Sequence, residues 1–401
     1  MTYNFNAEKM TKIIKDLSHF RRYVGEEDEV KAIRYCKDLY DEIDVDLKEE
    51  PFECVRGWVG WIQQAIFAFV SGMIGLMIYL LLTHPWMNLI IILVLVGIAG
   101  AITPGLMGTG GLKMIGNKYT SKNLIGTIPP KNEAKPKQYI IISGHHDSKS
   151  QVFSTVFRAL SYILMAIGAV FLLLSTLIAS ILDIIGSTPR WLQIFGLVFA
   201  IISLCGTIPL SLNFTGNKSP GALDNASSIA VIYEVARFIK EQGGLENTEL
   251  VVAIFGAEEV AMWGARAFCK AHKEDYPPED AVNINIDMVG YKDAPVEIMQ
   301  HYGLPVKKPV SEFMSALAFK VAEEQNVKLK GYWMPMGAST DGFVLRDNGY
   351  DGCEFNVIEA AMNTHQSTDD INKWDASMGV DNCRVIMGMI DKLSVHGIHQ
   401  K

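Results

Sequence analysis

The stretch Tyr139-Ile140-Ile141-Ile142-Ser143-Gly144-His145-His146-Asp147 decides the fold of this chain. Its first five residues are a short, largely β-branched run of the kind that forms a buried strand. In an extended segment residues i and i+2 share a face, so the side chains of His145 and Asp147 can act together while His146 points the other way. The stretch therefore predicts a buried strand that delivers an imidazole and a carboxylate at its carboxyl end.

Two later apolar runs repeat this pattern. The run 250–255 is followed by Glu258 and Glu259, and the run 282–286 is followed directly by Asp287. A further strand is expected at 123–128, and apolar spacing or strand–helix alternation predicts helices at 7–23, 27–43, 227–242 and 260–272. Strands that alternate with helices predict an α/β fold with a mainly parallel (mixed) sheet sandwiched by helices.

The carboxyl ends of parallel strands meet at one edge of a sheet, where open α/β folds place their sites. Carboxylates gathered there repel one another unless a cation lies among them. Taken singly, each candidate metal ligand could also have an ordinary structural role. Asp224 precedes a helix and could be an N-cap, Glu258 and Glu259 could be a solvated pair, and His365 could be an exposed loop histidine.

Two segments of the chain are unusually apolar. Residues 57–112 contain no Lys, Arg, Asp or Glu. The runs 59–82 and 88–107, and then 156–182 and 191–212, each reach the roughly 20 residues that cross a bilayer. We interpret them as four transmembrane helices inserted into the α/β domain as two hairpins.

The charges flanking these runs predict an orientation. Basic residues collect on the side of the polar segments, and the short opposite loops offer only Arg190. We therefore expect a multi-pass membrane protein whose α/β domain and both termini are cytoplasmic. The six cysteines show no paired spacing, which suits a reducing compartment. The net charge of −8, with no basic stripe, argues against a nucleic-acid partner.

Taken together and in order, the motifs resemble the M28 family of zinc aminopeptidases. The resemblance rests on Gly-His-His-Asp-Ser at 144–148, Ala-Leu-Asp-Asn-Ala-Ser-Ser at 222–228, Ala-Glu-Glu-Val-Ala-Met-Trp-Gly-Ala at 257–265 and Thr-His-Gln-Ser-Thr-Asp-Asp at 364–370. The stretch from Asp16 to Tyr40 is also similar to the N-terminal helices of the family. The likeness covers nearly all of the polar part of the chain.

The resemblance implies a co-catalytic site with two Zn²⁺, although a site of this kind also accepts Co²⁺ or Mn²⁺. His145, Asp224 and Asp287 would bind one ion. Asp224, Glu259 and His365 would bind the other, with Asp224 bridging the two.

The resemblance also assigns two catalytic roles. Glu258 would be the general base, and Asp147 would orient the imidazole of His145. The implied activity is hydrolysis of N-terminal residues from peptide substrates.

The chain departs from the family pattern in two respects. The family often has a Ser-Asp-His element before the last ligand, where this chain has Ser339-Thr340-Asp341-Gly342 without the histidine. The hairpins are the larger departure. They divide the peptidase domain into 1–56, 113–152 and 214–401, with hairpins at 57–112 and 153–213.

Two alternatives remain open at the level of sequence. One is a glutaminyl-cyclase-like acyltransferase with a single zinc, and the other is a catalytically idle peptidase-fold membrane receptor or assembly protein. The expected partners are peptide substrates and the lipid bilayer. The small residues Ser71, Gly72 and Gly75, together with those at 97–101, could also support a homodimer.

Overall fold

The computed structural model describes residues 3–94, 115–132, 138–335 and 339–398. Its chain divides into two compact units. Unit 1 comprises Met1–Cys54, Tyr119–Ser150 and Gly216–Lys401, and unit 2 comprises Val55–Lys118 and Gln151–Thr215. A small two-stranded sheet of β4 (Ser150–Gln151) and β5 (Thr215–Gly216) forms where the chain leaves unit 1 and returns to it.

Unit 1 is built on one mixed sheet with the strand order β1-β2-β6-β3-β7-β11-β8-β10, and β9 pairs with β8. The strands are β1 (Lys48–Val55), β2 (Lys118–Ile128), β3 (Gln138–His145), β6 (Thr248–Phe255), β7 (Ala281–Ile286), β8 (Val296–Tyr302), β9 (Lys308–Pro309), β10 (Leu329–Met334) and β11 (Asp351–Phe355). The central strands β6, β3, β7 and β11 are parallel, whereas β2 runs antiparallel to β6 and β8 antiparallel to β11. The mixed, mainly parallel sheet expected from the sequence is therefore confirmed.

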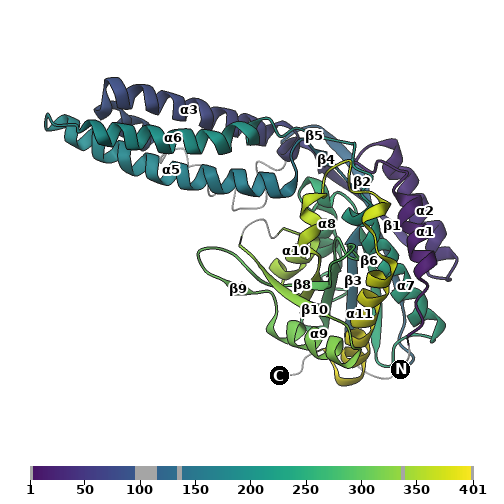
Figure 1. Ribbon diagram of the computed structural model, residues 1–401. Helices are drawn as coiled ribbons and strands as arrows, with labels where there is room; N and C mark the ends of the chain where they lie inside the picture. The colour runs from purple at the N-terminus through teal and green to yellow at the C-terminus, as the bar shows by residue number, and fades with distance from the viewer. Residues whose placement is uncertain (1–2, 95–114, 133–137, 336–338, 399–401) are drawn as a thin grey trace. The chain divides into compact units, whose positions relative to one another are not determined.

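Helices cover both faces of this sheet (Figure 1). The larger apolar core includes residues of α1 (Ala7–Leu17), α2 (Glu27–Asp41), α7 (Ser227–Glu241), α9 (Glu312–Glu324) and α11 (Ala376–His396). The smaller core, on the other face, includes residues of α8 (Trp263–His272) and α10 (Asp341–Asp347). Strand β3 divides its side chains between them, with Ile140 and Ile142 in the larger core and Tyr139 and Ile141 in the smaller.

The first helix is shorter than expected from the sequence. We predicted a helix over 7–23, but α1 ends at Leu17. Its amino end is capped by Asn6, whose side chain accepts a hydrogen bond from the amide of Lys9. At its carboxyl end the guanidinium of Arg22 donates to the carbonyl oxygen of Leu17 at 2.7 Å, so the chain folds back on the helix end. This turn brings Arg22 into the interior of unit 1.

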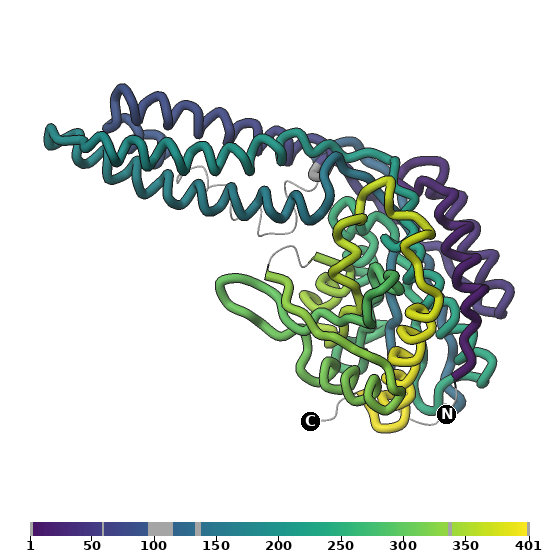
Figure 2. The backbone as a smooth tube through the Cα atoms, viewed as in Figure 1, coloured from purple at the N-terminus to yellow at the C-terminus, as the bar shows by residue number. Residues whose placement is uncertain are grey.

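The two ends of the chain meet within unit 1. Figure 2 shows the purple N-terminal segment beside the yellow C-terminal segment. The hydroxyl of Tyr3 donates to Asp391 at 2.7 Å, and the indole of Trp374 donates to Thr11 at 3.1 Å. Contacts between the N-terminal and C-terminal segments therefore help to close unit 1, whose sequence is interrupted twice.

Unit 2 contains three helices that are long and apolar enough to cross a membrane, among the residues that the structure describes. They are α3 (Gln63–Thr83), preceded by a π-helical turn from Trp58, α5 (Thr155–Ile184) and α6 (Arg190–Ser211). They match the predicted runs 59–82, 156–182 and 191–212. A short apolar helix covers 85–94, but most of the fourth run, 88–107, lies outside the described residues.

Small residues let the helices of unit 2 approach closely. A Cβ atom placed on Gly168 of α5 would lie 2.4 Å from the backbone nitrogen of Ser203 in α6. One placed on Gly206 of α6 would lie 2.3 Å from the carbonyl oxygen of Ser161. The α5–α6 contact is therefore a direct backbone approach of the kind that small residues permit in membranes.

Candidate metal centre

Three adjacent parallel strands deliver the central residues of the candidate site. His145 is the last residue of β3, Asp287 follows β7, and Glu258 and Glu259 lie in the turn after β6. Since β3 pairs with both β6 and β7, these strand ends meet at one edge of the sheet. The turn after β6 begins at Ala257, whose φ of 56° bends the chain sharply before the two glutamates.

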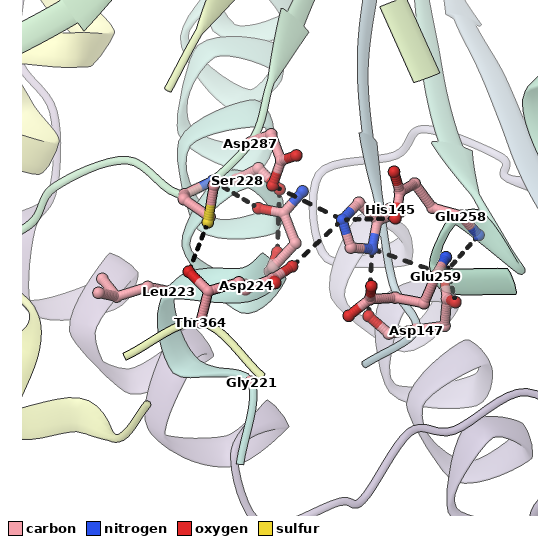
Figure 3. Close-up of polar contacts among 12 residues, drawn as sticks. His145, Asp147, Gly221, Leu223, Asp224, Ser228, Glu258, Glu259, Asp287 and Thr364 are labelled. Carbon is pink, nitrogen blue, oxygen red and sulfur yellow. Dashed lines mark hydrogen bonds and ion pairs between the residues drawn. The ribbon is translucent and has the colours of Figure 1, made fainter. Parts of the chain in front are cut away.

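His145 lies at the middle of the cluster (Figure 3). Its Nε2 atom is 3.4 Å from Asp224 Oδ1, 3.6 Å from Asp287 Oδ1 and 3.9 Å from Glu258 Oε2. Asp224 and Asp287 lie on one side of the imidazole ring, and Glu258 lies on the other. All four side chains are largely withdrawn from solvent.

Asp224 links His145 to the second histidine. Its Oδ1 faces His145, while its Oδ2 is 3.2 Å from Nε2 of His365. The same Nε2 atom is 2.9 Å from Oε2 of Glu259. Asp224 therefore faces both histidines, each through a different oxygen of one carboxylate.

Asp147 contacts both His145 and the turn that carries the two glutamates. Its carboxylate accepts hydrogen bonds from the backbone amides of Glu258 and Glu259, both at 3.1 Å. Nδ1 of His145 is nearer to the carbonyl oxygen of Asp147, at 3.1 Å, than to its carboxylate, at 3.5 Å. The residue thus holds the imidazole through its backbone and fixes the two glutamates through its side chain. His146 turns away, with Nε2 2.9 Å from the carbonyl oxygen of Lys122.

The pKa values of the two adjacent glutamates are shifted in opposite directions. Burial, together with the charges of Glu259 and Asp341, raises the pKa of Glu258 well above its ordinary value although His145 opposes this. Burial alone would raise the pKa of Glu259 too, but His365 and Lys149 outweigh it and the pKa of Glu259 is lowered. Neighbouring residues of one type are therefore prepared for different protonation states.

The donor atoms suit a metal. Two groups of imidazole and carboxylate atoms are close enough to hold an ion, the first formed by His145, Glu258 and Asp287 and the second by Asp224, Glu259 and His365. The first includes Glu258 where we predicted Asp224, although Oδ1 of Asp224 also lies 3.4 Å from Nε2 of His145. Among the described residues, Nε2 of His145 and Oδ1 of Asp287 are buried without a hydrogen-bond partner. Buried donor atoms left in this state are expected at a metal position.

Arg22 supports the loops of the site, and sequence reasoning missed it. Its side chain is completely buried and donates to the carbonyl oxygens of His146, Pro220 and Gly221 at 2.7–2.9 Å. It thereby joins the loop after β3 to the loop that carries Asp224. An arginine in a polar stretch after a helix gives no sequence signal of such burial.

Asp369 and Lys149 also reach the site. Asp369 accepts from the backbone amides of Leu223 and Asp224 at 2.8 and 3.1 Å, and burial beside Asp224 raises the pKa of Asp369 to about 8. Lys149 is one of the basic residues that precede the apolar run 156–182, and its ammonium nitrogen lies 2.7 Å from Oε2 of Glu259. Only the folded chain places this cation at the site.

Comparisons with known proteins agree with this fold. The model of peptidase family M28 matches residues 208–388, a range that contains all the candidate ligands except His145. Aminopeptidase YwaD of Bacillus subtilis (strain 168) is 38% identical over 72 residues, which are 18% of this chain and 15% of that relative. The chain therefore spans a small part of the length of this curated relative.

Solved structures share the fold over nearly the whole chain. BSAP, a zinc aminopeptidase from Bacillus subtilis, aligns with a TM-score of 0.57 at 15% identity, covering 97% of this chain and 95% of that one. The glutaminyl cyclase of Fimbriiglobus ruber aligns with a TM-score of 0.56 at 11% identity, covering 98% and 96%. The fold is that of zinc aminopeptidases, and residues 208–388 carry the similarity to peptidase family M28.

Proposed function

We propose that the chain is a membrane-anchored zinc aminopeptidase that removes N-terminal residues from peptides. The observation that carries the proposal is the position of Asp224, whose two carboxylate oxygens face His145 and His365 at 3.4 and 3.2 Å beside the carboxylate of Glu258. The M28 family match and the zinc aminopeptidase neighbours support zinc as the metal.

We assign the ligands as the sequence predicted them. His145, Asp224 and Asp287 would hold one zinc ion, and Asp224, Glu259 and His365 would hold a second. When bound, the metal pair supplies a Lewis acid for the scissile carbonyl and lowers the pKa of the attacking water.

The residues of the chain do the remaining work. Glu258 takes the proton from the attacking water and returns it to the leaving amine. Asp147 fixes the backbone amides of both glutamates, so the carboxylate of Glu258 is positioned before substrate arrives. Burial keeps bulk water from the cluster, which strengthens its electrostatic interactions.

The test is digestion of a peptide mixture by the purified full chain in detergent, read by mass spectrometry. We expect stepwise loss of N-terminal residues from free peptides, no cleavage of the same peptides with acetylated N-termini, loss of activity with a zinc chelator and its return with zinc. Cleavage at internal bonds, or hydrolysis that ignores the acetyl group, would contradict the proposal.

A second candidate is a glutaminyl-cyclase-like acyltransferase with one zinc ion. It is favoured by the similarity to the Fimbriiglobus ruber and Bacteroides thetaiotaomicron glutaminyl cyclases, which is as strong in fold as the similarity to the aminopeptidases. Peptides that begin with glutamine decide between the two. Loss of ammonia with the peptide otherwise intact would identify a cyclase, whereas release of free glutamine would identify an aminopeptidase. A receptor without activity would do neither.

The membrane part of the proposal rests on the three long apolar helices. We propose that they anchor the enzyme, with the peptidase unit and both termini in the cytoplasm as the basic flanks predict. The second hairpin lies in the sequence between the motifs of Asp147 and Asp224, and we propose that substrates are hydrophobic or arrive along the bilayer. A variant with both hairpins replaced by soluble linkers should lose activity toward hydrophobic peptides and keep activity toward polar ones. Unchanged cleavage of every peptide would refute this.

A further inference from the structure

The two ligand sets differ in how their donor atoms are satisfied. On the His145 side, Nε2 of His145 and Oδ1 of Asp287 are buried and have no hydrogen-bond partner among the described residues. On the His365 side, each oxygen of Glu259 already has a partner from the chain itself. A metal ion would supply the missing partner for the donor atoms on the His145 side. On the His365 side it would have to displace an existing partner of Glu259.

The competitor is Lys149. Its ammonium nitrogen lies 2.7 Å from Oε2 of Glu259 and donates to the backbone carbonyl of the same residue at 2.9 Å. Its backbone amide donates to Oε1 of Glu259 at 3.1 Å. The side chain is only 11% exposed, so bulk water screens this ammonium poorly.

The position of this ammonium matters because Oε2 of Glu259 is also the oxygen that faces His365, at 2.9 Å. A metal ion held by Glu259 and His365 must take this oxygen from Lys149, and it then lies near a positive charge. Two like charges a few ångströms apart in a partly buried site repel strongly enough to change an affinity by more than about tenfold.

We propose that Lys149 is a built-in cation that makes the His365 side of the centre a weak, exchangeable metal position, while the His145 side holds its metal firmly. This inference rests on the proposed zinc site. It predicts that the centre carries one firmly bound zinc ion and gains a second only at higher free zinc, with Lys149 neutralising Glu259 until then.

The experiment measures zinc bound to the full chain in detergent by elemental analysis, after equilibration with a series of zinc buffers. The variants are Lys149→Gln, which removes the charge, and Lys149→Arg, which keeps it. The backbone amide contact to Glu259 is available in all of them. We expect two binding steps in the wild type, a second step at least about tenfold tighter in Lys149→Gln, and little change in Lys149→Arg.

Two ligand variants assign the steps. His365→Ala should abolish the weak step, and His145→Ala should abolish the firm one. Melting temperatures add an independent readout, because Glu259 loses its counter-charge in Lys149→Gln. That variant should melt lower than the wild type without zinc and regain the difference when zinc saturates the second position.

The outcomes separate the two proposals. Two equally firm steps in the wild type, or an unchanged second step in Lys149→Gln, would overturn the role of Lys149 and leave the zinc peptidase intact. A wild-type chain that binds no zinc at any concentration would overturn the proposed function itself.

Discussion

The two units of the molecule bury polar groups of different kinds. The interior of unit 1 contains full charges, among them Arg22, Asp147, Glu234 and Glu259. In the described part of unit 2 the buried polar side chains are hydroxyls and amides, as in Ser161, Thr176, Ser203 and Gln64.

The partners of these groups differ as well. In unit 1 a buried charge joins elements that are distant in sequence, as Arg22 does with carbonyl oxygens more than a hundred residues away. In unit 2 most buried hydroxyls bond within their own helix, as Ser161 does with the carbonyl oxygen of Phe157 and Thr176 with that of Leu172. Buried charge in unit 1 therefore joins distant segments of the chain, whereas the buried polar groups of unit 2 are mostly satisfied within one helix.

The sharpest way to use this contrast is to remove the unit 1 carboxylate that we propose as the general base. Glu258→Gln keeps the size of the side chain but cannot accept the proton, so kcat for peptide hydrolysis should fall by about 10²–10⁴. Zinc content and melting temperature should change little. The matched control is Glu323→Gln on the exposed side of α9, which should keep full activity. A Glu258→Gln enzyme with near-normal kcat would remove this residue from the mechanism.

The next largest effect should come from the buried cation that joins the loops of the site. Arg22→Met leaves several buried carbonyl oxygens without a donor, and we expect unfolding of unit 1 to become easier by about 3–5 kcal/mol. Denaturant unfolding followed by the fluorescence of unit 1 measures the change. Arg21→Met, at the partly exposed neighbouring position, should cost far less. Equal losses in the two variants would mean that burial of Arg22 does not stabilise the fold.

A smaller effect should test unit 2. Gly168→Ala places a methyl group 2.4 Å from the backbone of α6, so α5 and α6 must move apart, at about 1–3 kcal/mol. The control is Gly75→Ala in α3, where a methyl group meets no atom of the described chain within 4 Å. Stability against a denaturing detergent, followed by circular dichroism, should fall for the first variant only. If both variants behaved alike, close packing of α5 on α6 would not hold unit 2 together.

The smallest effect should come from a charge at the surface of unit 1. His272 lies 2.9 Å from both Glu50 and Asp275, and the hydrogen bond to Glu50, helped by Asp275, raises the pKa of His272 above its ordinary value. The stabilisation is therefore complete below the unfolded pKa, near 6.5, and is lost as the pH rises through the higher folded value. The wild type should lose at most a few degrees of melting temperature over this window relative to His272→Asn. Parallel curves for both proteins would exclude the effect.

Much of the site could be anticipated from residues that follow strands. His145 and Asp287 were predicted correctly to lie together because an apolar run fixes a strand, and neighbouring parallel strands end at one edge. The structure also brings Asp224 and His365 to this edge, although both lie in irregular segments. Their place was inferred from the resemblance of whole motifs, since a loop has no period from which its side chains can be placed.

Other residues could not be found in this way. Arg22, Lys149 and Asp369 act on the site through contacts with segments more than a hundred residues distant. The part played by Asp147 was only half predicted, because its carboxylate bonds to the turn after β6 rather than chiefly to the neighbouring imidazole. The end of α1 at Leu17 depends on the same kind of contact, since Arg22 binds the last carbonyl of the helix.

The sequence by itself thus determined the α/β class, the strand ends that carry the acids and imidazoles, and the apolar runs long enough to span a bilayer. These depend on periodicity and length, which are local properties of the chain. Only the tertiary structure decided which charge faces which. It paired Lys149 with Glu259, and it left Nε2 of His145 and Oδ1 of Asp287 without a hydrogen-bond partner in the part of the chain that the structure describes. The strength of such electrostatic contacts is set by distance and burial in three dimensions.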